Sequence, residues 1–321
     1  MDDLDDNVSA HKILLITKEL KKVWKLTKNE APQYEGEIKV IDSSTHEYNN
    51  VYDNKGIIVV KDTDPFKVVA TYSKNLKTLL VTPACTTNKG GGVEEGIQTQ
   101  EAEICRRSNY RSALRKIEPK YYPLKPGTLI AAHQVNVFKG NAYKPLKEVF
   151  NTDIISIALP IRPSTIIENN RELYEREFDK NVTRKAFNLV INIAKTENYK
   201  VIILNNLGMG VNKHPTDDFI DILSEFIASG IACIYILLPK GTKTGSGRDD
   251  RYLFCRYRKE LSNRIDDPNS ECDEPDEDDP ETIEGRPQRR EIIEQVDEDA
   301  SVDEDSSEDE SDEEQIKVAS E

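Results

Sequence analysis

The sequence predicts an α/β fold, with a mixed sheet between two layers of helices in a three-layer α/β/α arrangement. Three observations predict it. Short apolar runs alternate with longer amphipathic stretches along residues 10–238, which is the pattern of strands and helices in one layered domain. Two of the apolar runs lead directly into glycine-containing turns. From Asp266 onward, acidic runs replace the apolar ones.

The individual elements follow from this alternation. An amphipathic helix is expected at residues 10–29, with Ser9 as its candidate N-cap and the domain core as its docking surface. Strands, rich in β-branched residues, are expected at residues 37–42, 57–60, 78–83, 128–138, 153–160, 200–204 and 231–238. Further helical stretches are expected at residues 62–73, after the first glycine turn, at residues 170–196 and at residues 216–228.

Residues 78–108 combine the features expected of a phosphate site. After an apolar strand, the chain turns through Asn88 into three consecutive glycines, Gly90, Gly91 and Gly92. A strand, a glycine loop and a helix in this order present backbone N–H groups to a phosphate. Glycine suits such a loop because it accepts positive φ and lets the backbone approach a ligand. A bare run of glycines is also common in flexible loops that bind nothing.

The helix after this loop is expected to carry an acid. At about 100° per residue, Ile97, Glu101, Ile104 and Ser108 share one face, so Glu101 lies on the inward stripe. A carboxylate on an inward face is costly unless it is paired or used. Glu101 is therefore the first candidate acid. Glu103 is the second, because a rotated or shifted helix would bring it to the same place.

At these residues the sequence resembles the microbial-type poly(ADP-ribose) glycohydrolases. Gly90, Gly91 and Gly92, a spacer and then Gln100-Glu101-Ala102 are similar to the family signature, in which Gly-Gly-Gly precedes Gln-Glu-Glu. The similarity continues at residues 105–108, 134–138 and 207–211, and it extends over roughly residues 5–238. The resemblance implies a macrodomain fold that binds ADP-ribose. No cofactor is expected, and the scattered cysteines and histidines predict no metal site.

The resemblance also implies the ligand-binding residues and the chemistry. The implied ligand-binding residues are Asn88, Gly90, Gly91, Gly92, Gln100, Val137, Phe138, Gly208, Met209, Gly210, Val211 and Asn212. In the family, the second Glu of the signature protonates the leaving ribose oxygen while water attacks the sugar, and the first Glu positions the ribose.

Four positions depart from the family pattern, and the departures leave the activity open. They are Thr82 for Asn, Lys89 for Pro, Ala102 for the second Glu and Asn212 for an aromatic residue. Loss of a catalytic acid commonly costs about 10²–10⁴-fold in rate. One reading is a divergent glycohydrolase that uses Glu101 or Glu103, and another is a macrodomain module that binds ADP-ribose without cleaving it. A third, a phosphate-loop protein for another nucleotide, is weaker because the loop lacks the Lys-Ser/Thr pair.

Charge divides the chain into a mildly basic body and an acidic tail. Residues 266–321 carry 26 acidic and 4 basic residues, whereas residues 1–265 carry 33 acidic and 40 basic ones. A basic body suits an anionic ligand such as a diphosphate. The tail cannot bury enough apolar surface to fold and is a candidate ligand for a basic partner. We therefore expect a docked helix at residues 1–30, the ADP-ribose-binding domain at residues 31–265 and a disordered tail at residues 266–321.

The remaining features indicate an intracellular protein, cytoplasmic or nuclear. The five cysteines are an odd number without metal-ligand spacing, the start lacks the pattern of a signal peptide, and no apolar run could span a bilayer. Two basic stretches with aromatic residues, Tyr121-Tyr122 and its neighbours and residues 241–259, are candidates for contact with a base or a nucleic acid. Partly buried packing and a solvated basic loop are the plainer explanations of the two stretches.

Overall fold

The computed structural model describes residues 2–46, 57–208, 212–228, 231, 233–238, 256–257 and 260–261. The chain divides into two units, Met1–Asp276 and Glu277–Glu321, and all described residues belong to the first. The acidic tail expected at residues 266–321 and most of the basic stretch at residues 241–259 lie outside the described residues.

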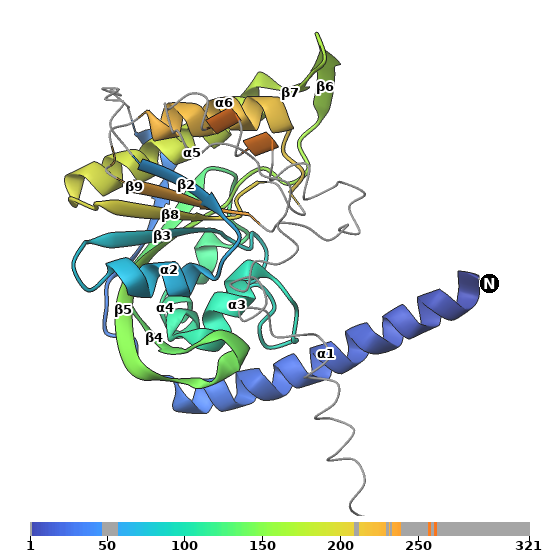
Figure 1. Ribbon diagram of the computed structural model, residues 1–321, viewed down its shortest axis with the longest axis vertical. Coiled ribbons are helices and arrows are strands. Elements are labelled where there is room, and N and C mark those ends of the chain that lie inside the picture. Colours follow the sequence, from blue (N-terminus) through green and yellow to red (C-terminus); the bar gives the residue numbers. More distant parts are fainter. Residues whose placement is uncertain are drawn as a thin grey trace, which may run out of the picture. The chain divides into compact units, whose positions relative to one another are not determined.

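A seven-stranded mixed sheet forms the centre of the described domain (Figure 1). The strand order is β1-β4-β5-β3-β8-β9-β2. The strands are β1 Ile38–Asp42, β2 Ile57–Lys61, β3 Thr78–Pro83, β4 Thr128–Lys139, β5 Pro145–Ile157, β8 Val201–Asn205 and β9 Cys233–Leu237. Strand β4 runs antiparallel to both of its neighbours, and all other neighbouring strands are parallel. Because β3 and β8 are adjacent and parallel, the loops that follow them open at the same edge of the sheet.

Helices cover both faces of this sheet (Figure 1), which confirms the predicted α/β fold class. On one face lie α5 (Glu177–Thr196) and α6 (Thr216–Ile227), and on the other lie α2 (Pro65–Tyr72), α3 (Gln100–Arg107) and α4 (Tyr110–Arg115). The alternation of side chains along β3 explains the two cores. Leu79 and Val81 pack with α5 and α6, whereas Leu80 packs with α2, α3 and α4.

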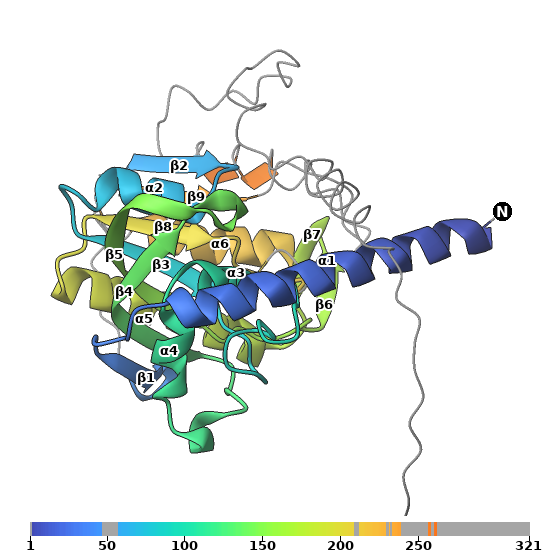
Figure 2. The same cartoon turned by 90° about the horizontal axis from the view of Figure 1, so that it is seen from below.

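Helix α1 (Asp2–Glu30) runs along the face that carries α3 and α4 (Figure 2). Its inward side buries Leu20 and Trp24, and Thr27 Oγ1 donates a 2.8 Å hydrogen bond to the carbonyl of Arg106 in α3. The helix expected at residues 10–29 is therefore confirmed. The expected cap is wrong, because α1 begins at Asp2 and Ser9 lies inside it.

The helical stretch expected at residues 170–196 is a strand followed by a helix. Strand β7 (Arg171–Tyr174) pairs antiparallel with β6 (Thr165–Glu168), and α5 begins only at Glu177. Asn169 and Asn170 join the two strands with φ of 50° and 60°. Asparagine accepts this left-handed conformation, which suits a two-residue hairpin turn. The turn residues therefore override the helical pattern that continues into this segment. Strand β5 also begins earlier than expected, at Pro145.

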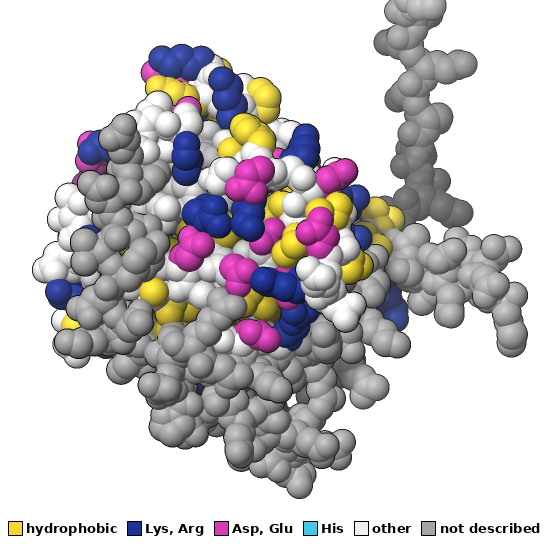
Figure 3. Space-filling model, turned by 90° about the horizontal axis from the view of Figure 1, so that it is seen from above, with side chains coloured by type: hydrophobic (Ala, Val, Ile, Leu, Met, Phe, Trp, Pro, Cys, Tyr) yellow, Lys and Arg dark blue, Asp and Glu magenta, His cyan; other side chains and the backbone are white. Residues whose placement is uncertain are grey.

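The face formed by α5, α6 and the β6–β7 hairpin carries both signs of charge side by side (Figure 3). Three ion pairs on this face are Lys180–Asp218 at 2.7 Å, Arg184–Glu225 at 3.0 Å and Arg171–Asp221. Because opposite charges are neighbours here, the described residues of this face form no extended surface of a single sign.

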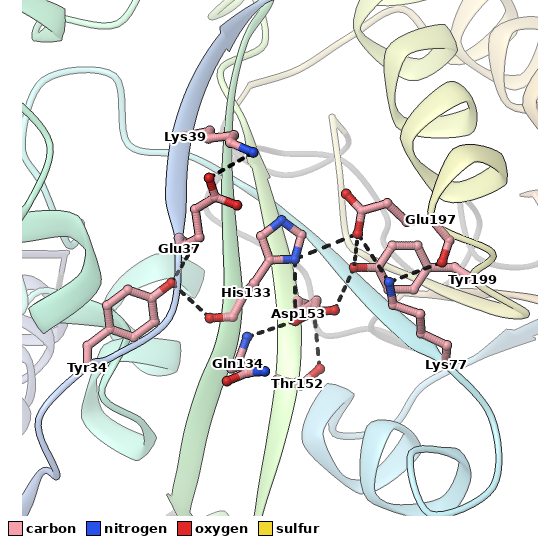
Figure 4. Close-up of polar contacts among 10 residues, drawn as sticks. All are labelled: Tyr34, Glu37, Lys39, Lys77, His133, Gln134, Thr152, Asp153, Glu197 and Tyr199. Atoms are coloured by element: carbon pink, nitrogen blue, oxygen red, sulfur yellow. Dashed lines mark hydrogen bonds and ion pairs between the residues drawn. The ribbon is translucent and has the colours of Figure 1, made fainter.

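A polar cluster joins β4 and β5 to the residues just before β3 and β8 (Figure 4). The glycine loop follows the other end of β3. His133 Nδ1 is 3.6 Å from Asp153 Oδ1 and 3.8 Å from Glu197 Oε2. Tyr199 donates a 2.6 Å hydrogen bond to Asp153 Oδ2. A bulge in β4 brings the backbone N–H of Gln134, at φ 56°, within 2.8 Å of Asp153 Oδ1. The cluster thus joins β4, β5 and the segment between α5 and β8.

The charge states in this cluster make part of the stability depend on pH. The hydrogen bond to the Asp153 carboxylate raises the pKa of His133 by more than burial lowers it, and the charges of Asp153, Glu197 and Glu37 add smaller increases. Burial alone would raise the pKa of Asp153, but its contacts with His133, Tyr199 and the Gln134 N–H lower it. The His133 contribution is complete below its ordinary pKa and is lost as pH rises through the raised folded-state pKa. The Asp153 contribution is lost as pH falls through its lowered folded-state pKa.

We expect His133→Gln to lower the free energy of unfolding by up to about 1 kcal/mol near pH 5.5 and by much less near pH 8.5. The reason is that only protonated His133 pairs with the two carboxylates. Urea unfolding of the full chain at the two pH values measures the difference. His46→Gln is the control, since the contacts of the His46 ring within the described part of the chain are with its near neighbours Asp42 and Thr45. An equal loss of unfolding free energy at both pH values would contradict the pairing of protonated His133 with the two carboxylates.

Candidate functional site

The loop after β3 is built from consecutive turns around three glycines. Gly90, Gly91 and Gly92 have φ of 82°, 60° and 78°, a conformation that glycine adopts without strain. The Gly91 N–H donates to the carbonyl of Asn88 at 3.1 Å. A Cβ on Gly91 would lie 2.2 Å from Thr99 Oγ1. The close packing of Thr99 therefore requires glycine at position 91.

Helix α3 is tied to this loop at its first turn. Thr99 is the N-cap, and its hydroxyl accepts a 3.1 Å hydrogen bond from Ala102 N while donating a 2.8 Å bond to Gly91 O. One hydroxyl thus fixes both the helix start and the glycine loop. Ile97 lies before the helix and is 47% exposed, so the expectation that it shares the inward helix face is wrong. Ile104 and Ser108 are buried as expected.

Glu101 is a buried acid at the start of α3, with a side chain only 2% exposed. Its Oε2 accepts a 3.2 Å hydrogen bond from the backbone N–H of Cys85, just past β3, and its Oε1 has no hydrogen-bond partner among the described residues. Burial raises the pKa of Glu101 to about 8, against the opposing effects of the Cys85 N–H, the Arg111 charge and the N–H groups of Gly90 and Gly91. A carboxyl with a raised pKa and an unused oxygen is typical of a functional site.

Arg111 and Tyr122 lie beside the same loop, on the side of α4. A Cβ on Gly90 would lie 2.6 Å from Arg111 Cδ, so the arginine stem packs against the loop. Its Nη2 donates to Glu94 Oε1 at 3.1 Å. Its Nε and Nη1, like the Tyr122 hydroxyl, are buried and have no hydrogen-bond partner within the part of the chain that the structure describes. The sequence pattern does not mark Arg111. Tyr122 belongs to the tyrosine pair that is a candidate for stacking on a base. This pair is the sequence feature that could have marked Tyr122 as a site residue.

The turn after β8 meets α3 through Gln100. Its Nε2 donates a 3.3 Å hydrogen bond to the carbonyl of Asn206, while Gln100 Oε1 and Asn206 Oδ1 are both buried without partners. Asn206 was not among the expected site residues, although it follows directly after an apolar strand. Gly208, at φ 78°, accepts a 3.0 Å hydrogen bond from His214 N. The other expected residues of this turn, Met209, Gly210 and Val211, lie outside the described residues.

Three expected ligand-binding residues have contacts elsewhere in the domain. Val137 is fully buried and bridges to Ser108, just past the C-terminal end of α3. Phe138 follows it, with Lys139 Nζ 5.9 Å from its ring centroid. The Asn212 carbonyl accepts a 2.8 Å hydrogen bond from Arg162 N, in the connection between β5 and β6. No contact described for these residues reaches Gly90, Gly91 or Gly92.

The second candidate acid, Glu103, faces away from the glycine loop. Tyr143 donates a 2.7 Å hydrogen bond to Glu103 Oε2, and Arg106 and Arg107 lie 3.8 and 3.9 Å from its carboxylate. Its side chain is 38% exposed. Glu101 and Glu103 are two positions apart on α3 and so point to different sides of the helix. Glu101 is therefore the acid that the structure joins to the loop.

Ala102, at the position of the family's second Glu, lies in the apolar core. It is 0% exposed and belongs to the cluster that contains Trp24, Leu80 and Ile104. A longer acidic side chain placed there would have to enter this cluster or displace its neighbours. The core around position 102 is thus packed for a small apolar side chain.

Two further properties concern the described part of the chain only. It contains no group of three or more His, Cys, Asp or Glu side chains that could hold a metal ion. Among the helices that the structure describes, none combines the length and the apolar character needed to cross a membrane. Cys85, Cys105 and Cys233 are free thiols.

Residues 6–152 match the family model of the microbial-type PARG catalytic domain. The predicted resemblance to microbial-type poly(ADP-ribose) glycohydrolases is thereby confirmed. The matched segment contains the glycine loop, α3, Arg111 and Tyr122, and it ends within β5. No curated protein matches the sequence.

Solved structures of bacterial PARG enzymes share this fold. The enzyme from Thermomonospora curvata is 18% identical with a TM-score of 0.55, over 68% of this chain and 85% of the other. Its complex with the inhibitor ADP-HPD is 17% identical with a TM-score of 0.54, over 68% and 84%. The enzyme from Deinococcus radiodurans in complex with ADP-ribose is 15% identical with a TM-score of 0.52, over 77% and 92%. At these identities the likeness shows the fold alone.

Proposed function

We propose that this protein binds ADP-ribose between the glycine loop and the turn after β8, and that it cleaves the glycosidic bond slowly with Glu101 as proton donor. The observation that carries the proposal is Glu101 itself. It is a buried acid with a raised pKa and an unpartnered oxygen, held against a glycine loop at the carboxyl end of β3. The fold match to PARG structures solved with ADP-ribose supports the choice of ligand.

The free polar atoms of the site suit a ligand that has both phosphate and sugar groups. Gln100 Oε1 and Asn206 Oδ1 are buried, have no partner among the described residues and can accept hydrogen bonds from ribose hydroxyls. Glu101 Oε1 likewise has no partner there and can donate a hydrogen bond while the carboxyl is protonated. A loop of residues with positive φ after a parallel strand presents N–H groups that suit a diphosphate. Buried polar atoms gain most when a ligand completes their hydrogen bonds.

The chemistry assigned to Glu101 is general acid catalysis. With a pKa of about 8, the carboxyl is mostly protonated at neutral pH and can give its proton to the leaving ribose oxygen as the C–O bond breaks. Water then bonds to the positively charged sugar carbon and returns a proton to the Glu101 carboxylate. The site stabilises this step by holding the sugar against the acid. The rate should therefore fall as pH rises through about 8.

A second candidate is a module that binds ADP-ribose without cleaving it. Ala102 favours this function, because the position of the family's second Glu lies in the apolar core. Glu101 would then act as an acceptor for ribose hydroxyls only. Both candidates require the same binding site.

One preparation of the full chain distinguishes the two candidates. Calorimetric titration with ADP-ribose measures binding, and release of ADP-ribose from poly(ADP-ribose) measures turnover. Saturable binding with slow release supports the glycohydrolase, and saturable binding without release supports the binding module. Absence of saturable ADP-ribose binding would overturn both.

A further inference from the structure

Strand β6 (Thr165–Glu168) is the outer strand of the β6–β7 hairpin. It lies on the side of β7 that faces away from α6 (Figure 1). Its Ile167 is 78% exposed, more than any other large apolar side chain that the structure describes. The site proposed for ADP-ribose does not include this strand. An outer strand leaves backbone N–H and C=O groups available for pairing with another strand.

The direction of these backbone groups follows from the neighbouring strand. Glu172 N and Tyr174 N donate hydrogen bonds of 2.6 and 2.8 Å to two carboxylates in the first turn of α6, so both N–H groups point away from β6. In an antiparallel pair, residues directly opposite each other turn their backbone groups either both inward or both outward. Thr165 is opposite Tyr174, and Ile167 is opposite Glu172. The N–H and C=O groups of Thr165 and Ile167 therefore point outward, away from β7.

These outward groups have no partner in the described part of the chain. Helix α6 covers the free edge of β7, but no described hydrogen bond reaches the backbone of Thr165 or Ile167 from outside the hairpin. Proteins commonly protect an exposed edge strand with a charged residue or a proline. Positions 165–167 hold neither, and Thr165, Ile166 and Ile167 are all β-branched residues that favour strands. The edge is therefore open to another strand.

We infer that β6 pairs antiparallel with β6 of a second copy of this chain, about a two-fold axis at Ile166. This register places Thr165 of each copy opposite Ile167 of the other. Each of these two pairs exchanges both of its N–H···O bonds, because all the groups concerned point outward. Ile166 then faces Ile166 of the second copy. Glu168 falls opposite Ser164, so that no like charges oppose each other.

The symmetry of the free groups favours a second copy over a segment of another protein. The outward residues, 165 and 167, are equally spaced about 166, so the strand complements itself and a closed two-fold contact results. The contact is short, so the association is weak and depends on concentration. Ile161 and Phe178, which are 56% and 67% exposed, lie in the segments before and after the hairpin and can add apolar surface.

Cysteine cross-linking of the full chain tests the register. Facing residues that are not hydrogen-bonded in antiparallel strands have Cα atoms about 4.5 Å apart, within the range of about 4.4–6.8 Å that a disulfide spans. Ile166→Cys should therefore form a disulfide between two copies in oxidised glutathione. Ile167→Cys is the matched control, because its Cα would lie about 9 Å from the same atom of the second copy. Wild type measures the background from the native thiols.

The control is demanding because Ile167 is more exposed than Ile166. Random collisions would cross-link Ile167→Cys more than Ile166→Cys, whereas the proposed register predicts the reverse by severalfold. Mass spectrometry of the linked peptides identifies the cysteines that have reacted. Cross-linking of Ile167→Cys that equals or exceeds that of Ile166→Cys would overturn the inference.

A proline substitution tests the association without added thiols. Ile167→Pro removes an N–H that the hairpin does not use, and proline is tolerated on an edge strand. Ile167→Val keeps the N–H and is the control. In sedimentation experiments, wild type and Ile167→Val should change from one copy to two between about 1 and 500 μM, and Ile167→Pro should associate at least about tenfold more weakly.

Cooperative thermal unfolding of Ile167→Pro would show that the hairpin change leaves the domain folded, and the cross-linking result decides if it does not. A wild-type chain that stays monomeric over this concentration range would overturn the inference and leave the edge to an extended segment of another protein. Neither experiment involves ADP-ribose, so failure here does not affect the proposed function.

Discussion

Glu101→Gln is expected to lower the rate of ADP-ribose release from poly(ADP-ribose) about 10²–10⁴-fold, because it removes the proposed proton donor. Glutamine keeps the shape of the side chain and can still accept a hydrogen bond from Cys85 N. ADP-ribose affinity should therefore change less than about tenfold. The measurement is initial rate at saturating polymer over a pH series. The residual rate of the variant should also lack the decline that wild type shows above about pH 8.

Glu103→Gln is the matched control for this experiment. It makes the same chemical change two positions along α3, where the carboxylate contacts Tyr143 and not the loop. Its rate should stay within about twofold of wild type. If Glu103→Gln lost activity and Glu101→Gln kept it, the assigned acid would be wrong.

Removing the Glu101 charge should also change stability in a pH-dependent way. A carboxyl with a raised folded-state pKa stabilises the protonated fold, so wild type loses stability as pH rises from the ordinary carboxyl pKa to about 8. The neutral glutamine variant escapes this loss. Its free energy of unfolding should exceed that of wild type above about pH 8 and come closer to it near pH 5. Such behaviour would show that the acid is kept buried at a cost in stability.

Gly91→Val should have the second large effect, on both ADP-ribose binding and stability. Valine resists a φ of 60°, and its Cβ would lie 2.2 Å from Thr99 Oγ1, which caps α3. Strain at the loop and loss of the cap together should cost about 3 kcal/mol of unfolding free energy. Displacement of the loop should weaken ADP-ribose binding at least about tenfold even where the variant is fully folded. Thermal unfolding and calorimetry on the same sample measure the two effects.

Gly140→Val controls for the general cost of a branched residue at a glycine. Gly140 lies in the connection between β4 and β5. The nearest atoms to a Cβ at this position would be Leu146 Cδ2 at 3.1 Å and Lys144 O at 3.9 Å. Its ADP-ribose affinity should match wild type. Gly208→Val is a poorer test of binding, because a Cβ at Gly208 would lie 2.4 Å from the Phe219 ring in the core. A folded Gly91→Val chain with wild-type affinity would mean that the glycine loop does not contact the ligand.

The seven strands of the sheet could be predicted because each contains a short apolar run. The buried parallel strands β3, β8 and β9 read as continuous apolar runs, since both of their faces are covered. The hairpin at β6 and β7 was missed because its few residues adjoin a long helical pattern, so only Asn169 and Asn170 mark it. The predicted N-cap of α1 is too far along the chain. The helix begins in a polar segment that has no apolar stripe, so the sequence pattern does not mark this first part as helical.

The candidate site could be predicted only in part. Gly90, Gly91, Gly92 and Glu101 are close in sequence, so a local pattern brings them to attention. Arg111 and Tyr122 lie beside the loop because of how α4 and the turn at residues 119–121 pack against it. This tertiary packing is not visible in a local sequence pattern. The core position of Ala102 likewise follows from how α3 packs against the sheet and α1. A helical pattern alone places the boundaries of a helix only to within about two to four residues, which leaves this rotation open.

The most direct test of the central claim is a calorimetric titration of the full wild-type chain with ADP-ribose and, in parallel, with ADP. ADP is the matched ligand that lacks the second ribose. If the site is as proposed, ADP-ribose binds at one saturable site and more tightly than ADP, because its extra hydroxyls complete hydrogen bonds to buried acceptors such as Gln100 Oε1 and Asn206 Oδ1. No saturable heat with ADP-ribose up to about millimolar concentration, where even weak sites bind, would contradict the account.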